Sequence, residues 1–240
     1  MPYLERRRQF ECRLTPDRAL TTLEEAEAFL DDRGLLTLMP DSALPSLFGA
    51  CHEPPYKPGS RGFGLWPATK YPWGVELAER RLRTKLHRGK GLFLSEEVAA
   101  LADPLCRDEL ARADEGEHGP EAQRLVRRLA ELGPALPEEL ETDRRTRERL
   151  ERLGATVSRP VLVEGRYTSE LARWDQLRPT LPSGSEPQSA LEELLLAGVR
   201  AAVVAPEREA AGWFSWRANL AQLVEEGRLV RPEPGVVCLP

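Results

Sequence analysis

The sequence has no long apolar run and few histidines. No stretch approaches the roughly 18 uninterrupted apolar residues that a membrane-spanning helix needs. Residues 1–20 are charged throughout, without the apolar centre of a signal peptide. Only three histidines are present to serve as bases or metal ligands. These absences predict a cytoplasmic protein with no membrane partner.

Cysteine is also sparse and unpaired in spacing. The four cysteines stand far apart, at Cys12, Cys51, Cys106 and Cys238. This spacing excludes a zinc motif and a disulfide scaffold, so we expect reduced thiols, no metal and no cofactor. A scattered metal site that combines Cys51 and His52 with a further Cys or His is the alternative.

Familiar catalytic motifs are missing as well. The sequence contains no Gly-x-Ser-x-Gly, no His-Glu-x-x-His and no P-loop. Cys51 and His52 are sequence neighbours, which is not how a nucleophile and its base usually meet. The common hydrolase, metalloprotease and nucleotide-triphosphate sites are therefore not indicated.

The charge pattern is uneven along the chain. The net charge is -5, but basic residues gather at residues 6–8, 80–90, 124–128 and 144–152. Phosphate contact depends on clustered Lys and Arg more than on the overall sum. An acidic protein with local basic faces is compatible with salt-sensitive DNA binding.

The order of predicted elements repeats in the second half of the chain. Helical periodicity, caps and turn residues predict the following elements: helices at 120–132, 137–140 and 144–153 with strands at 155–163 and 166–174, then helices at 190–201, 206–212 and 215–226 with strands at 228–231 and 236–239. Asp143 and Ser189 are expected to cap two of these helices. Three helices followed by a two-stranded ribbon is the order of a winged helix.

The N-terminal half is less regular. We expect a helix at 22–32 with a capping box of Thr22 and Glu25, strands at 35–39 and 91–94, and helices at 75–86 and from 96. The fold class is therefore mostly α with small β-ribbons (α+β), as tandem winged-helix modules, three in number. The predicted units are residues 1–113, 114–180 and 187–240, with a Pro, Ser and Gly-rich linker at 179–187.

Residues 54–74 combine aromatic rings with cations. Aromatic rings can stack on unpaired bases while Lys and Arg hold phosphates. The candidate DNA contacts here are Arg61, Trp66, Lys70 and Trp73. The alternative is a long loop that buries its rings against the first unit.

Two further segments offer DNA contacts. Residues 86–94 hold His87, Arg88 and Lys90 among glycines whose amides could approach a phosphate. The helix at 144–153 has the length of a recognition helix and offers Arg144, Arg145 and Arg149. A solvated turn and a solvated helix face are the alternatives.

The sequence resembles a known family at residues 43–64, which read ALPSLFGACHEPPYKPGSRGFG, and at residues 65–70, LWPATK. This run resembles the AlkZ-related proteins of actinobacteria. The likeness extends to residues 85–94, 103–110, 171–176 and 197–216. These proteins are similar to the AlkZ and YcaQ crosslink-repair DNA glycosylases. The resemblance implies three tandem winged helices with a concave DNA-binding surface, and excision of bulky alkylated purines without metal or cofactor.

The sequence departs from that family at its catalytic motif. The glycosylases carry Gln-hydrophobic-Gln or Gln-hydrophobic-Asp, and neither occurs here, where the comparable residues 41–48 read DSALPSLF. We therefore expect a nucleoid-associated protein that binds double-stranded DNA, intact or damaged, without catalysis. An active glycosylase using Asp41 or Glu53 is the alternative, and a protein-interaction scaffold is a third. Nothing in the sequence indicates the oligomeric state.

Overall fold

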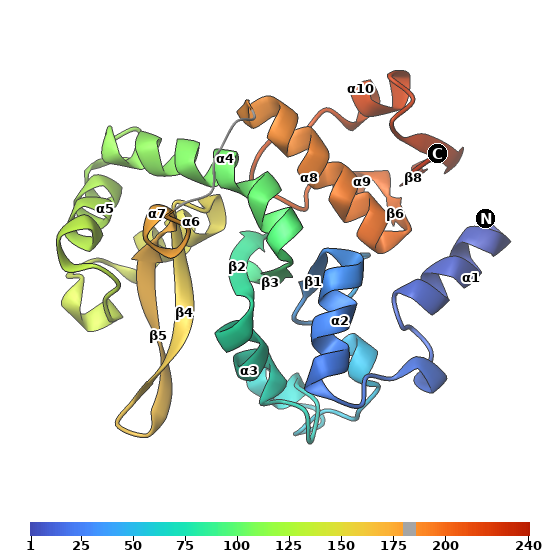
Figure 1. Cartoon of the computed structure of the whole chain (residues 1–240), viewed down its shortest axis with the longest axis horizontal. Helices are drawn as coiled ribbons and strands as arrows, with labels where there is room; N and C mark the ends of the chain where they lie inside the picture. Colours follow the sequence, from blue (N-terminus) through green and yellow to red (C-terminus); the bar gives the residue numbers. More distant parts are fainter. Residues whose placement is uncertain (180–185) are drawn as a thin grey trace.

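The computed structural model describes residues 1–179 and 186–240. The described chain is mixed α and β, with about half of its residues in helices and with small antiparallel sheets (Figure 1). The expected α+β class is therefore confirmed. No helix among these residues is long and apolar enough to cross a membrane.

The N-terminal part contains four helices and a small three-stranded sheet. Its elements are α1 (Pro2–Glu11), α2 (Leu23–Arg33), β1 (Leu35–Thr37), the 3-10 turns η1 (Pro16–Arg18), η2 (Gly49–Cys51) and η3 (Gly62–Leu65), α3 (Trp73–Arg80), β2 (Leu82–His87), β3 (Lys90–Leu94) and α4 (Glu96–Asp114). Thr22 caps α2 through the amide of Glu25 as predicted, but the Glu25 carboxylate accepts from Thr21 instead of completing the box.

The sheet of this part, in the order β1-β3-β2, is buried on both faces. Alternate side chains of a strand point to opposite faces. Leu92 and Leu94 therefore enter the large core that continues through the rest of the molecule, whereas Phe93 enters a smaller core under α2 and α3. The sheet ties the two cores together.

The middle part follows α4. Its elements are α5 (Pro120–Leu132), η4 (Pro137–Glu139), α6 (Arg144–Leu153), β4 (Thr156–Val163), β5 (Arg166–Arg173) and α7 (Trp174–Leu177). The predicted bounds of α5 and α6 are confirmed, and the Asp143 side chain accepts a hydrogen bond from the amide of Thr146 to cap α6. Leu132 is 44% exposed, since it ends the helix.

The C-terminal part packs against α4. Its elements are α8 (Pro187–Ala202), β6 (Val204–Pro206), α9 (Glu207–Ala210), α10 (Leu220–Glu225), β7 (Val230–Glu233) and β8 (Val236–Cys238). Residues of α4 and α8 belong to one core, which also takes residues from β1, α5 and β8. Figure 1 shows α4 passing between the middle and C-terminal parts.

The three parts repeat one order of elements and one pairing rule. The first sheet runs β1-β3-β2 and the last runs β6-β8-β7, so the final strand lies in the centre of both. In the middle part, Ala135 forms an isolated antiparallel bridge with Leu171 of β5, in the place that β1 and β6 occupy in the other sheets. A helix precedes each of these first positions. The helical segments that follow are η2, η3 and α3 in the first part, η4 and α6 in the middle part, and α9 and α10 in the last.

Several predicted elements are wrong. Residues 75–86 were predicted as one helix, but α3 ends at Arg80 and β2 begins at Leu82, because the apolar side chains of β2 pair in a sheet that periodicity could not show. The helix predicted at 215–226 is shortened to α10, which Asn219 caps. Ser189 lies inside α8, since that helix starts earlier at Pro187.

Residues 180–185 of the predicted linker lie outside the described residues.

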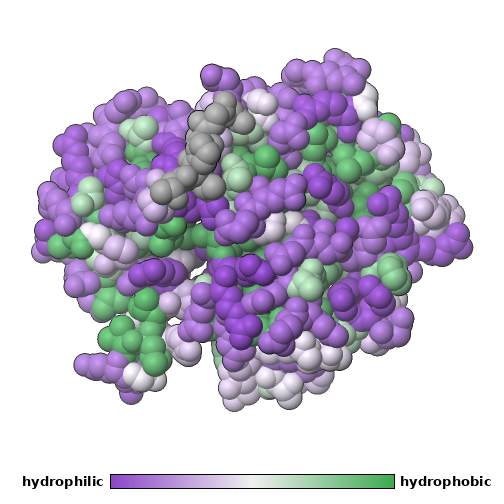
Figure 2. Space-filling model, viewed as in Figure 1, coloured by the Kyte–Doolittle hydropathy of each residue, from purple (hydrophilic) through white to green (hydrophobic). Residues whose placement is uncertain are grey.

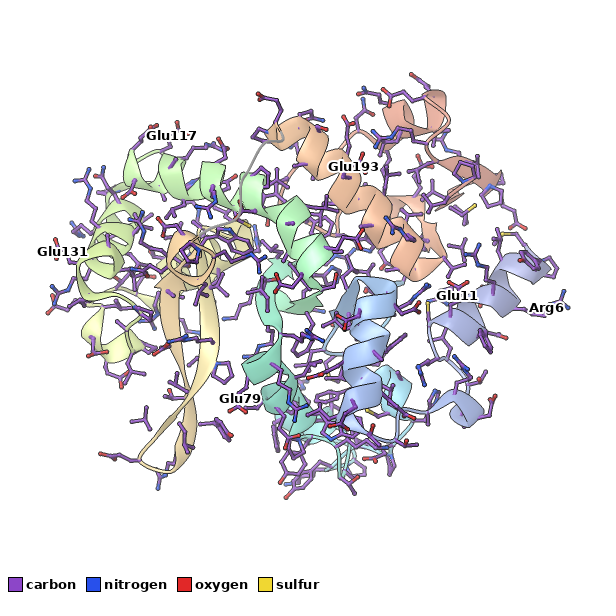
Figure 3. All side chains as sticks on the ribbon, viewed as in Figure 1. Arg6, Glu11, Glu79, Glu117, Glu131 and Glu193 are labelled. Carbon is purple, nitrogen blue, oxygen red and sulfur yellow. The ribbon has the colours of Figure 1, made fainter. Side chains whose placement is uncertain are left out.

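The β4–β5 hairpin is the most prominent projection. Its tip carries three exposed apolar side chains, Leu162, Val163 and Tyr167. Figure 2 shows this tip as a green projection beyond the body of the molecule. Glu79 of α3 is labelled beside the hairpin in Figure 3, and its carboxylate raises the pKa of Tyr167.

Candidate nucleic-acid interface

One face of α6 is strongly basic. Arg145, Arg149 and Arg152 are exposed and stand four and three residues apart. This spacing brings side chains to the same side of a helix, one turn above another. Asp143 starts the helix and Leu150 anchors its opposite side in the core, so the basic face is turned outward.

The turn between β2 and β3 faces this helix. Arg88 and Gly89 both have positive φ values, of 54° and 75°, as the two central residues of a tight hairpin turn. A Cβ atom on Gly89 would lie 3.6 Å from the Arg152 side chain, so the turn comes close to α6. The Gly89 amide donates to the Lys85 carbonyl at 3.0 Å, and it is therefore not available to a phosphate.

Between the turn and the helix lies an open pocket of about 500 Å³, which we call the main pocket or basic pocket. The side chains that line it with Gly89 are Lys85, Arg88, Arg145, Glu148, Arg149 and Arg152. Glu148 is also paired with Arg144 at 2.6 Å. The pocket therefore gathers five cations against one carboxylate, and that carboxylate has a partner of its own.

The arginines of the pocket keep their charge unneutralised. Arg88 donates to the carbonyl oxygens of Gly212 and Glu209, at 3.1 and 3.3 Å, and Arg149 donates to the carbonyl of His118 at 3.3 Å. Carbonyl oxygens orient a guanidinium group without cancelling its formal charge. Within the described residues, Arg145 and Arg152 form no ion pair either. These four groups can meet an anion.

Lys85 differs because its ammonium pairs with the buried carboxylate of Glu151 at 2.7 Å. The Ser158 hydroxyl also donates to Glu151. Since Glu151 belongs to α6 and Lys85 to β2, the pair fixes the helix against the strand. Lys85 therefore serves to position the pocket walls as well as to add charge.

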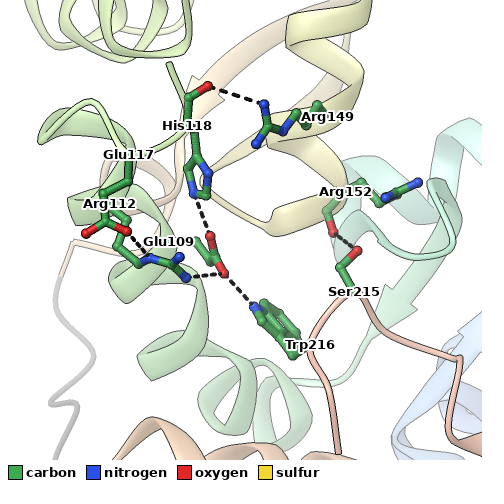
Figure 4. A network of polar contacts seen from close by, with 8 residues as sticks. All are labelled: Glu109, Arg112, Glu117, His118, Arg149, Arg152, Ser215 and Trp216. Atoms are coloured by element: carbon green, nitrogen blue, oxygen red, sulfur yellow. Dashed lines mark hydrogen bonds and ion pairs between the residues drawn. The ribbon is translucent and has the colours of Figure 1, made fainter. Parts of the chain in front are cut away.

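A second network fixes α6 on its other side (Figure 4). The buried carboxylate of Glu109, on α4, accepts hydrogen bonds from His118 at 2.7 Å and from Arg112 and Trp216 at 3.2 Å. The His118 carbonyl in turn receives Arg149. The basic face is therefore braced by α4 and by the loop that carries Trp216, and Arg149 is oriented before any ligand arrives.

A smaller basic pocket lies near the start of α6. It has a volume of about 290 Å³ and is lined by Arg124, Arg127 and Arg128 of α5 together with residues 140–142 and Glu131. Arg124 and Arg128 pair with Glu121 and Glu131 respectively, so this pocket is less positive than the first.

Not every predicted contact belongs to the main pocket. His87 is fully buried, and burial lowers its pKa to about 4, so its ring cannot reach a phosphate and we remove it from the candidate contacts. Lys90 is exposed but pairs with Asp41. Asp41 is thus engaged by a cation rather than arranged beside a water as a base. Arg144 is exposed and paired with Glu148.

Glu53 and Lys70 hold together the segment at residues 54–74, which we call the aromatic loop. The Glu53 carboxylate accepts from the amides of Thr69 and Lys70, at 2.9 and 3.2 Å, and from the Lys70 ammonium at 2.9 Å. Partial burial raises the pKa of Glu53, but these hydrogen bonds outweigh it and lower the pKa to about 2. A carboxylate held this way remains ionised and serves to hold the loop, so it is a poor general base.

Trp66 and Trp73 are half-buried and pack against the smaller core, where Trp66 meets Phe48 with ring centroids 5.2 Å apart. Arg61 precedes η3 and is exposed. The two tryptophans therefore follow the alternative in which the loop buries its rings against the first unit. The most exposed aromatic residues of this loop are Tyr56 and Phe63, at 55% and 49%.

The four thiols are free and buried. Burial raises the pKa of Cys51 to about 12, and its thiol donates to the Leu47 carbonyl at 3.3 Å. His52 turns away to the Arg13 carbonyl, at 2.7 Å. Cys51 and His52 therefore do not form a nucleophile and base, and the described residues hold no group of three or more His, Cys, Asp or Glu that could bind a metal.

Two members of the pocket, Arg152 and Lys85, were not among the predicted DNA contacts. Arg152 lies in the basic run at 144–152 and continues the spacing of Arg145 and Arg149 by one more turn. Lys85 was hidden by the incorrect helix at 75–86.

Comparison with known proteins adds no relative. No family model matches the chain, and no curated protein or solved structure is found to be similar to it.

Proposed function

We propose that this chain is a DNA-binding protein made of three winged helices. The repeated order of helix, first strand or bridge, helical segments and ribbon supports this, since a winged helix has that order. The shared pairing of the last strand with the first supports it further. In this proposal α3, α6 and α10 are the equivalent third helices, and the ribbons β2–β3, β4–β5 and β7–β8 are the wings.

The observation that carries the proposal is the convergence of unpaired arginines in the main pocket. Arg88 comes from the first unit and Arg145, Arg149 and Arg152 come from the second, and none of them forms an ion pair among the described residues. Taking four like charges to one place costs free energy unless an anion shares them. A polyanion such as the DNA backbone supplies that counter-charge and releases its own counterions when it binds.

Duplex DNA is the polyanion that best fits the shape of this face. A helix such as α6, with 10 residues and an outward basic side, can enter the major groove. The β4–β5 hairpin projects beyond the body with apolar side chains and Arg166 at its tip, as a wing that reaches a neighbouring groove would.

The resemblance to the AlkZ-related proteins belongs to the same proposal. In this proposal the chain keeps the scaffold of the crosslink-repair glycosylases but not their catalytic activity. The family's catalytic motif is missing from the sequence, and the two substitute carboxylates are engaged elsewhere, Asp41 with Lys90 and Glu53 with the loop. We therefore propose binding without base excision.

The experiment measures duplex binding by fluorescence anisotropy at low salt. We expect the double variant Arg145→Glu/Arg149→Glu to lose at least about tenfold in affinity. Arg200→Glu is the matched control, because Arg200 is an exposed arginine on α8 outside the pocket. An unchanged affinity of the double variant would contradict the proposal. Incubation with an alkylated duplex, followed by mild base, is expected to give no strand breaks.

A further inference from the structure

The aromatic loop presents an exposed ring cluster separate from the basic pocket. Tyr56, Phe63 and Leu65 are 55%, 49% and 46% exposed, within a span of ten residues. Exposed large apolar side chains scattered singly are ordinary, but a contiguous group of them marks a binding surface. We call Tyr56, Phe63 and Tyr71 the ring cluster.

The rings of the cluster contact one another and are fixed from below. Phe63 lies edge-on to Tyr56 and Tyr71, with centroids 5.7 and 5.4 Å apart, and Tyr56 lies 5.5 Å from Tyr71. Beneath them, the Trp66 ring is 4.8 Å from Phe63 and continues to the smaller core. The cluster is therefore supported by the half-buried Trp66, while Tyr56 and Phe63 remain exposed to solvent.

The backbone of the loop is closed like a hairpin. The Tyr56 amide donates to the Trp66 carbonyl at 2.6 Å, and the Lys57 amide donates to the Gly64 carbonyl at 2.8 Å. A Cβ atom on Gly64 would come within 1.7 Å of the Ser60 hydroxyl, so a side chain at this position would displace Ser60. The loop therefore holds its rings in place in advance, which reduces the entropy lost when a ligand binds.

The charge around the cluster favours an anionic ligand. Residues 54–75 contain no acidic side chain, although the whole chain has 39 Asp and Glu. The same segment holds Lys57 and Arg61, both exposed, whereas Lys70 is paired with Glu53 just before the segment. An apolar protein partner would need no such bias, whereas a ligand that combines flat rings with phosphates is matched by both features.

We propose that Tyr56 and Phe63 form a stacking platform for the unpaired bases of single-stranded DNA, with Lys57 and Arg61 along its backbone. Bases in a duplex hide their faces in the stack, so a platform of this kind selects unpaired ones. Stacking on aromatic rings is tolerant of sequence because every base has a π-face. The platform stands independently of the α6 pocket and of the duplex binding proposed for it.

The test compares two fluorescent single strands of about 20 units. One is oligothymidylate and the other is an abasic oligomer with the same phosphates and no bases. The full chain should bind oligothymidylate more tightly than the abasic oligomer. Tyr56→Leu and Phe63→Ala should lower the affinity for oligothymidylate by about 5- to 150-fold and leave the affinity for the abasic oligomer unchanged.

Two controls separate stacking from folding. Tyr56→Phe keeps the ring and should keep the affinity. Tyr3→Ala removes a ring that is 68% exposed on α1, and it should have no effect. The melting temperatures of all variants should stay close to that of the parent chain. If Phe63→Ala unfolds, Tyr56→Leu still tests the proposal, because it keeps an apolar side chain of similar volume.

Equal binding of the two oligomers, or full affinity in Tyr56→Leu, would overturn the proposal. A loss of binding to a proline-rich peptide, with oligothymidylate unaffected, would identify a protein-binding surface instead. Failure of the duplex proposal is distinct, because it would appear in the Arg145→Glu/Arg149→Glu variant and leave the difference between the oligomers intact.

Discussion

The basic pocket makes a quantitative prediction about salt. We consider replacement of Arg145, Arg149 and Arg152 by alanine, singly and together. The three side chains span about 10 Å along α6, which is enough for each to meet its own phosphate. Since none forms an ion pair among the described residues, removing one should leave no carboxylate without its partner.

The magnitude follows from the number of contacts. Each neutralised phosphate contributes about -0.9 to the slope of log K against log salt. Four contacts, from Arg88 and the three α6 arginines, therefore contribute about -3.6, which is an affinity loss of about 150-fold between about 50 and 200 mM NaCl. Each single alanine should flatten the slope by about 0.9, and the triple variant by about 2.7.

The assay is fluorescence anisotropy of a labelled duplex across that salt range. Arg200→Ala is the control, because it removes the same charge from α8. Arg144→Ala would be a poor control, since it frees Glu148, which lines the pocket. A triple variant with the slope of the parent chain would refute the assignment of this face, whatever its affinity.

Three other predictions concern stability and are tested by urea unfolding. The fully buried His87 ring has a pKa of about 4, below the ordinary 6.5, so as the pH falls the unfolded chain takes up the proton before the folded chain does. The free energy of unfolding should therefore be at its full value above pH 6.5 and fall by about 3 kcal/mol toward pH 4. His87→Leu should remove this loss. Glu53→Gln should cost about 1.5 to 3 kcal/mol at pH 7, because it weakens charged hydrogen bonds; no loss would contradict the closing role of this residue. Gly198→Ala should lower the free energy of unfolding by about 1 to 3 kcal/mol, since the new Cβ atom would lie 2.8 Å from the Trp213 ring. Gly212→Ala is the control: its Cβ atom would lie 3.7 Å from the nearest neighbour, and it should change stability by less than about 0.5 kcal/mol.

Local signals made the middle part predictable. In α5 the apolar spacing coincides with a start at Pro120 and a stop at Gly133, and in α6 the cap at Asp143 and the stop at Gly154 agree with the basic stripe. Propensity, capping and periodicity all point to one structure there. The positions of Arg145 and Arg149 on one face followed from sequence for the same reason.

The N-terminal part was predicted less well because its local signals conflict. Residues 82–86 follow a helix without a glycine or proline between them, and the strand they form is stabilised by pairing with β3. Strand formation depends on partners distant in sequence, so a single segment does not reveal it. The exposed rings were misjudged likewise, since nothing in the order of residues 54–74 tells which aromatic packs inward.

The sequence by itself determined the ends of α5 and α6, the α+β class and the basic stripe of α6, because each depends on residues within a few positions of one another. The tertiary structure alone decided that Arg88 and Arg152 line one pocket, that His87 is buried, and that Tyr56 and Phe63 are more exposed than Trp66 and Trp73. These outcomes depend on contacts between segments far apart in the chain, and such contacts are selected by the packing of the whole core, not by any local preference.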